Sequence, residues 1–167
     1  TTKSGSISAP LRSRFGITER LDFYEDDDLA QIILQSATFL DCVISKESAQ
    51  HIAKSSRGTP RIAKKLLRRV RDFAQVHNKN KATENIVKQA LSFLGIDEAG
   101  LTKVHNLYLR KIIENFNGGP VGLETLASLI GEDKETLEIV YEPFLIRRGF
   151  LQKTPRGRQI PPRMIPF

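Results

Sequence analysis

The sequence has little cysteine and no long apolar run. Every apolar run in its 167 residues falls well short of the roughly 18 to 20 residues that a membrane-spanning helix needs. No signal peptide precedes the patterned region. We therefore expect a soluble, unexported protein with a cytoplasmic location and no membrane partner.

The sequence also lacks the usual patterns of metal and nucleotide chemistry. The single cysteine, Cys42, cannot form an internal disulfide and is interpreted as a reduced, partly buried thiol. No Cys/His metal spacing is present, and the acidic run Glu25–Asp28 is interpreted as a helix cap, so we expect no metal site. There is no Gly-x-x-x-x-Gly-Lys-Ser/Thr loop and no apolar strand ending in Asp-Glu, so this chain alone should not hydrolyse a nucleotide. The three histidines are isolated, and we expect surface or helix-end positions for His51, His77 and His105.

Positive charge is abundant but unevenly placed. The net charge is +7, which favours a polyanionic partner. Residues 97–146 hold 4 Lys/Arg against 9 Asp/Glu, whereas residues 147–167 hold 6 Lys/Arg and no acidic residue. An acidic block therefore lies directly before a purely basic tail, which is a modest indication of nucleic-acid binding.

Apolar residues recur at helical spacing through the first half of the chain. Asp26–Asp28, Ser45 and Thr59 followed by Pro60 are typical helix starts. The helices expected from these signals span 27–40, 46–55, 60–77 and 83–94, with a polar turn over 78–82. Together they form a four-helix unit.

A second unit follows turn residues at 95–100. Helices are expected over 102–116, 123–130 and 134–148, then a strand over 150–154, a turn over 155–158 and a short return strand over 159–160. Three helices closed by a basic hairpin indicate a winged-helix domain. The fold class is therefore mainly α, with a segment 1–25, a helical domain 26–96 and a winged-helix domain 97–167.

Arg61 stands where its charge is locally unfavourable. A cation in the first turn of a helix opposes the helix dipole by about 0.3 to 1 kcal/mol, and a bound anion would reverse that cost. Pairing with a carboxylate of Asp26–Asp28 is the alternative, and composition does not separate the two.

Arg12 and Arg14 lie on a segment bounded by Pro10 and Gly16. Arginine on such a turn suits insertion into a phosphate site of a neighbouring subunit, and a surface salt bridge is the alternative. Because the chain starts at Thr1 within patterned sequence, we expect a fragment or a processed product.

The hairpin carries Lys153, Arg156 and Arg158 around Pro155 and Gly157, which suits contact with a phosphate backbone. The helix before it is acidic, and only Lys134 at its start is usable for DNA. We therefore expect wing-led, sequence-independent binding of duplex DNA, weakened by Arg158→Ala on every sequence. The acidic residues are Glu132, Asp133, Glu135, Glu138 and Glu142.

Several runs closely resemble the RuvB family of AAA+ motors that migrate Holliday junctions. The similarity spans essentially the whole chain, but it begins after the family's Walker A and Walker B motifs, which implies that most of the large ATPase domain is missing. The runs are Thr1-Thr2, Pro10–Ile17, Leu21–Tyr24, Arg57–Ala63, Leu67–Phe73, Gly118–Leu123 and Gly149–Arg158.

The resemblance implies roles for individual residues. Thr1 or Thr2 would be the sensor 1 region, and Arg14, with Arg12 as second candidate, would reach nucleotide phosphate at the subunit junction. Tyr24 would line the adenine site and Arg61 would be sensor 2. Lys153 and Arg158 would contact DNA; family members often carry arginine at the first of these positions, and lysine keeps its charge without the bidentate fork.

The resemblance also implies the domains, cofactor and partners. Residues 1–25 would end the large ATPase domain, 26–96 would be the AAA+ lid and 97–167 the DNA-binding winged helix. The whole protein would be an ATP-driven helicase of recombination and repair, with Mg²⁺ held by the missing domain. It would form a hexameric ring on a Holliday junction, with RuvA and a RuvC-type resolvase as partners in the full complex.

Two alternatives remain open. The first is a non-enzymatic winged-helix regulator of DNA, against which the acidic recognition helix argues. The second is the lid and C-terminal part of another AAA+ DNA-processing ATPase, such as an initiator or a clamp loader. We expect the chain itself to be a monomer that binds DNA weakly and with strong salt dependence.

Overall fold

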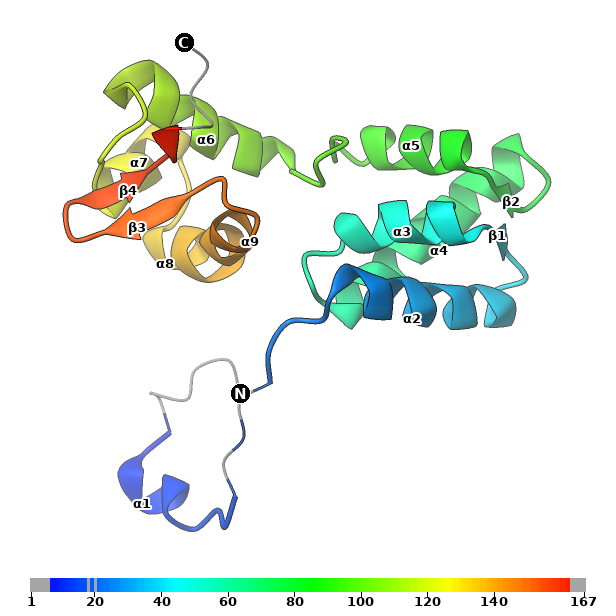
Figure 1. Ribbon diagram of the computed structural model, residues 1–167, viewed down its shortest axis with the longest axis horizontal. Helices are drawn as coiled ribbons and strands as arrows, with labels where there is room; N and C mark the ends of the chain where they lie inside the picture. The colour runs from blue at the N-terminus through cyan, green and yellow to red at the C-terminus, as the bar shows by residue number, and fades with distance from the viewer. Residues whose placement is uncertain (1–6, 18, 20, 163–167) are drawn as a thin grey trace.

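The computed structural model describes residues 7–17, 19 and 21–162. It begins with an exposed segment that contains one short helix, α1 (Ala9–Arg12). Figure 1 shows α1 lying apart from two larger units, a helical domain and a domain with a small β-hairpin.

The helical domain consists of four helices, as the apolar spacing predicted. They are α2 (Asp26–Phe39), α3 (Lys46–Lys54), α4 (Pro60–His77) and α5 (Glu84–Phe93). Ser45 caps α3 as expected, since its Oγ accepts a hydrogen bond from the Ser48 amide at 3.2 Å. The helices bury one apolar core whose centre includes Leu29, Ile52 and Leu67, all fully buried. Burial of this shared face holds the four helices together.

Two very short strands cross-link the helical domain. β1 (Val43–Ile44) pairs in parallel with β2 (Lys81–Ala82), where the sequence predicted only a polar turn. Asn80 supports the pairing, because its Nδ2 donates to the Asp41 carbonyl at 2.9 Å. Strands of two residues are too short for any alternation to reveal them.

The winged-helix domain contains α6 (Lys103–Phe116), α7 (Leu123–Ile130) and a recognition helix over 134–147. The recognition helix is divided into α8 (Lys134–Thr136), a π-helical turn η2 (Leu137–Tyr141) and α9 (Glu142–Arg147). A regular α-helix would need the N–H that Pro143 lacks and would crowd its ring. The wider turn, which ends two residues before Pro143, relieves that conflict.

The wing is a tighter hairpin than the sequence predicted. β3 (Gln152–Thr154) pairs antiparallel with β4 (Gly157–Gln159), so only Pro155 and Arg156 form the turn. Arg158 was expected in the turn and instead lies within β4, opposite Lys153. Val121 joins the far edge of β4, because the Val121 and Arg158 amides each donate to the other's carbonyl at 2.9 and 2.8 Å. These bonds tie the wing to the start of α7.

A second apolar core lies between the wing and the helices of this domain. Tyr108, Leu126 and Leu145 are fully buried in it. This second core is separate from the first, and the two have no buried residue in common.

Candidate functional site

Tyr24, the loop before α4 and the first turn of α4 meet at one corner of the helical domain. The Tyr24 amide donates to the Gly58 carbonyl at 3.0 Å, and Tyr24 as a whole remains 46% exposed. Arg61 is exposed at the second position of α4, directly after Pro60. Residues 58–61 thus position both exposed residues: Gly58 binds the backbone of Tyr24, and Arg61 follows three residues later.

Two of the three carboxylates considered as partners of Arg61 are engaged elsewhere. Asp26 forms an ion pair with Arg148 at 2.9 Å, and Asp27 accepts a hydrogen bond from Gln50 at 2.5 Å. Among the residues that the structure describes, the Arg61 side chain has no hydrogen-bond or ion-pair partner. Its position at the start of a long helix therefore remains suited to an anion.

Arg12 and Arg14 are both exposed on the N-terminal segment. Arg12 donates from Nη2 to the Ile7 carbonyl at 3.1 Å, which is a local contact. Figure 1 shows α1 lying apart from α2 and α4 of the helical domain. Thr1 and Thr2 lie outside the described residues.

Charged side chains connect the wing to the recognition helix. Lys153 Nζ lies 2.5 Å from Glu138 Oε1, and Arg158 Nη2 lies 3.3 Å from the same oxygen. Lys153 donates the closer of these bonds and lowers the pKa of Glu138. Glu138 was interpreted as a source of repulsion toward DNA, but it is the partner of two basic residues of the wing.

Arg158 also reaches a buried carboxylate. Its Nε donates to Glu142 Oε1 at 2.8 Å, and Tyr108 donates its hydroxyl to the same oxygen at 2.7 Å. The side chains of Arg158 and Glu142 are only 12% and 1% exposed. The sequence expectation that Arg158 presents a free charge at the wing tip is therefore corrected by the structure, since its guanidinium faces the domain interior.

The two remaining basic candidates differ in their surroundings. Arg156 occupies the exposed hairpin turn, and it has no ionic or hydrogen-bond partner within the described part of the chain. Lys134, at the start of α8, pairs with Glu124 at 2.6 Å, and both side chains are more than half exposed. Arg156 is thus the basic side chain of the wing that the fold leaves free for a ligand.

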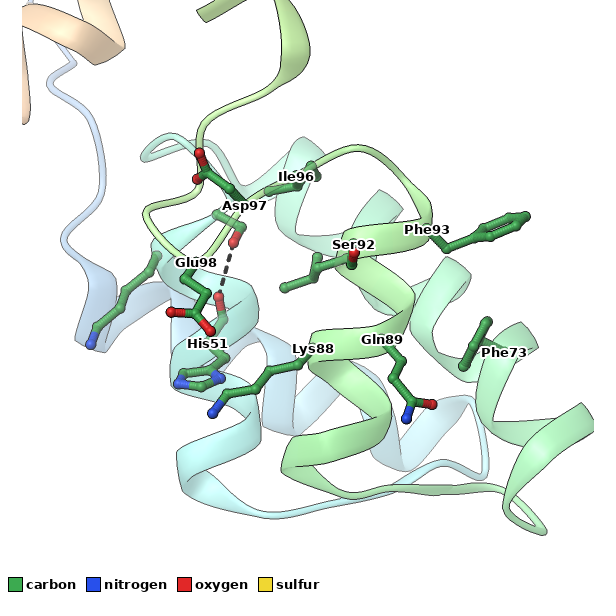
Figure 2. Close-up of a pocket in the computed structure, with 12 residues that line it drawn as sticks. His51, Phe73, Lys88, Gln89, Ser92, Phe93, Ile96, Asp97 and Glu98 are labelled. Atoms are coloured by element: carbon green, nitrogen blue, oxygen red, sulfur yellow. Dashed lines mark hydrogen bonds between the residues drawn. The ribbon is translucent and has the colours of Figure 1, made fainter. Parts of the chain in front are cut away.

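A groove of the described surface lies elsewhere. It has a volume of about 910 Å³ and is lined by residues of α3, α4 and α5 and by residues 96–98. Figure 2 shows His51, Lys88 and Glu98 at one end of this groove and Phe73 and Phe93 at the other. None of the candidate residues named above lines it.

Within 7–17, 19 and 21–162, no helix combines the length and apolar character needed to cross a membrane. No group of three or more His, Cys, Asp or Glu side chains in this part of the chain is placed to hold a metal ion.

Two protein-family models match the chain one after the other. The RuvB AAA lid domain matches residues 24–97, and the RuvB C-terminal winged helix domain matches residues 98–166. The chain belongs to the RuvB family. The resemblance found in its sequence runs and the expected fold class, a helical AAA+ lid followed by a winged helix, are both confirmed.

Solved RuvB structures share this fold. The Thermotoga maritima RuvB Holliday junction branch migration motor is 46% identical, with a TM-score of 0.87, and the match covers 96% of this chain and 54% of that one. Two mutants of the same Thermotoga protein match at 46% identity with TM-scores of 0.87 and 0.88, covering 96% of this chain and 53% of theirs. The chain spans about half the length of the RuvB structures it matches.

Sequence reasoning missed two polar groups in the core of the RuvB winged helix. His105 lies at a helix end, one of the two positions expected for it, but it is fully buried. Its Nδ1 accepts a hydrogen bond from the Thr102 amide at 3.0 Å. His105, the third residue of α6, thus forms a capping box with Thr102 at the start of that helix. The Thr102-x-x-His105 spacing was available as a signal. Glu142 had no comparable signal, because its partners Tyr108 and Arg158 are distant in the sequence.

Proposed function

We propose that this chain forms the lid and the DNA-binding winged helix of an ATP-driven motor that migrates Holliday junctions. The observation that carries the proposal is the succession of two RuvB domains over residues 24–166. The Thermotoga relative of this architecture is a Holliday junction branch migration motor. ATP and Mg²⁺ would be held largely by the part of a longer RuvB protein that this chain does not cover.

The corner at Tyr24 and Arg61 would face the nucleotide. Tyr24 would line the adenine, and Arg61 would contact phosphate, where helix N–H groups and a guanidinium act together. The free position of Arg61 supports this role. Arg14, or Arg12 in its place, would act on the nucleotide of a neighbouring subunit, and Thr1 or Thr2 would belong to the sensor 1 region.

The wing would contact the DNA backbone without reading its sequence. Arg156 would make the leading contact, with Lys153 beside it and Lys134 at the edge of the surface, because phosphate contacts carry no sequence information. Arg158 would support the wing through Glu142. Independence of sequence suits a motor that must move along any DNA.

Assembly with other chains completes the proposal. The longer protein would form a hexameric ring in the cytoplasm, working with RuvA and a RuvC-type resolvase in recombination and repair. ATP hydrolysis between subunits would move the lid, and the winged helix would pass that motion to DNA.

A chimeric motor tests this function. The part of Thermotoga maritima RuvB that has no counterpart here would be fused to this chain and supplied with ATP, Mg²⁺ and a synthetic Holliday junction. We expect ATP-dependent branch migration, which Arg61→Ala abolishes and Arg68→Ala, at an exposed position of α4, leaves intact. A folded, hexameric chimera that neither hydrolyses ATP nor moves the junction would contradict the proposal.

A further inference from the structure

Two arginines at the end of the recognition helix contact the helical domain. Arg148 forms an ion pair with Asp26 at 2.9 Å and donates from Nη2 to the Lys54 carbonyl at 2.9 Å. Its guanidinium carbon lies 5.6 Å from the centre of the Phe144 ring, a buried part of the winged-helix core. Arg148 is thus anchored in one domain and bonded to the other.

Arg147 contacts the same corner from the adjacent position. Its guanidinium carbon lies 5.2 Å from the centre of the Phe23 ring, and its Nη1 donates to the Tyr24 carbonyl at 3.4 Å. Gly58 allows this approach, since a Cβ there would overlap Arg147 Nη1 and lie 2.7 Å from Phe23 Cβ. The close fit involves Phe23 and Tyr24, which precede α2, and Gly58 in the loop that leads to α4.

These contacts differ from ordinary surface ion pairs. The Arg148 and Asp26 side chains are only 28% and 23% exposed, whereas exposed pairs contribute little because water screens them. The contacts also reach backbone carbonyls, so they fix the position of the chain as well as its charge. The corner that the two arginines contact contains Tyr24, whose amide donates to the Gly58 carbonyl. Arg61 follows Gly58 by three residues.

The covalent connection provides a second, separate attachment. In the turn between α5 and α6, Asp97 Oδ1 accepts from the Ala99 and Leu101 amides at 3.0 and 2.8 Å. Asn106 of α6 donates to the other Asp97 oxygen at 2.7 Å. With the turn between α5 and α6 alone, the winged helix would be free to rotate relative to the helical domain. A second attachment at a different place, through Arg147 and Arg148, fixes its orientation.

We propose that Arg147 and Arg148 are positioning residues that set the orientation of the winged helix on the corner formed by Phe23, Tyr24, Asp26 and the loop 54–58. The orientation of the wing then follows any displacement of this corner. The consequence for the motor rests on the proposed function, because it takes Tyr24 and Arg61 as nucleotide contacts. The arginine pair would carry a movement of that corner to the DNA-binding wing.

Distances between spin labels test the positioning directly. In a Cys42→Ala background, labels at Gln35→Cys in α2 and Ser128→Cys in α7 report the separation of the two domains. We expect one narrow distance distribution for the parent chain, a broad one for Arg148→Met and an unchanged one for Arg110→Met, an exposed arginine of α6.

Asp26→Asn provides a second variant that removes the ion pair and leaves the bond from Arg148 to Lys54. We expect it to broaden the distribution less than Arg148→Met, with the thermal midpoints of both variants close to that of the parent. If Arg148→Met unfolds the winged helix, Asp26→Asn still decides the matter. A folded variant of either kind with the parent distribution would overturn the proposal.

Amide hydrogen exchange distinguishes a local change at this corner from a general loss of stability. Arg148→Met should speed exchange of the Tyr24 amide several-fold, because its bond to Gly58 lies in the gripped corner, and leave the fully buried Leu67 amide unchanged. Equal exchange at Tyr24 in both chains would count against the proposal. Failure of the parent chain to bind DNA would instead contradict the proposed function and leave the distances and exchange rates untouched.

Discussion

Glu142 places a carboxylate in the apolar core of the winged helix, with a side chain 1% exposed. Arg158 and Tyr108 are its partners, at 2.8 and 2.7 Å. A buried charge is tolerated only when it is paired and hydrogen-bonded. The buried charge of Glu142 therefore depends on a single arginine of β4, Arg158, as its charged partner.

Removing that arginine should destabilise the domain. Arg158→Met leaves Glu142 without its charged partner, and we expect the free energy of unfolding to fall by about 3 kcal/mol. Arg156→Met, a matched change at the exposed turn, should alter it by less than about 0.5 kcal/mol. Denaturant titration followed by tyrosine fluorescence measures both, since Tyr108 and Tyr141 report on this domain.

A double substitution separates charge pairing from packing. Adding Glu142→Gln to Arg158→Met removes the unpaired charge and keeps an acceptor for the Tyr108 hydroxyl. We expect most of the lost stability to return. If the double variant is as unstable as Arg158→Met, the loss comes from packing and the charge argument is wrong.

His105 should make the winged helix sensitive to acid. Burial, together with the charge of Arg57, lowers its pKa to about 4, whereas the unfolded chain has a value near 6.5. The unfolded state therefore binds the proton first as the pH falls, and stability is lost from about pH 6.5 downward. Between pH 7 and pH 4 this residue should reduce the free energy of unfolding by about 3 kcal/mol.

His105→Gln provides the comparison, because glutamine can keep the capping box and does not titrate. Denaturant titrations from pH 7 to pH 4 should show a shallower fall for the variant. Parallel curves for the two chains would mean that His105 does not titrate as described.

At the scale of elements, the wing depends on a close approach of backbone. Gly157 has φ of 132°, and a Cβ there would lie 2.7 Å from the Val121 carbonyl carbon. Gly131, with φ of 75°, has no atom within 4 Å of its added Cβ. Both glycines have a backbone conformation that is unfavourable for other residues, but of the two only Gly157 is also packed against a neighbouring backbone, that of Val121.

Alanine at these two positions should therefore have different effects. Gly131→Ala should cost about 1 kcal/mol through strain alone, and Gly157→Ala should cost more and open the wing. Hydrogen exchange checks this at the Val121 and Arg158 amides, which should lose protection only in Gly157→Ala. Retained protection at both amides would show that the strand can shift to make room.

Helices were the predictable elements, because apolar spacing and caps are local signals. Both ends of α7 and the cap of α3 followed from residues within one turn. The β1 and β2 pair and the inward side chain of Arg158 depend on contacts between residues distant in the sequence. For the candidate site, the sequence predicted the residue types and motifs, but it could not show which charged side chains are paired in the fold and which are not. Arg61 and Arg156 remain free in the described chain, but Arg158 does not.

At the scale of the whole molecule, the separation of charge along the sequence disappears in the fold. Arg148, Lys153 and Arg158 of the basic tail pair with Asp26, Glu138 and Glu142. Among the described residues of the tail, Arg156 is the clearest unpaired charge. The fold thus concentrates the proposed DNA contact at the turn of the wing, and net charge alone overstates the binding surface.

The central claim is that this wing binds DNA through phosphate contacts. The most direct test is the affinity of the chain for two duplexes of unrelated sequence, measured by fluorescence anisotropy from low to moderate salt. We predict similar affinities for both duplexes, and a slope of log K against log salt that Arg156→Ala reduces by about 0.9 and Arg68→Ala leaves unchanged. A strong preference for one duplex, or a slope that Arg156→Ala does not alter, would contradict the account.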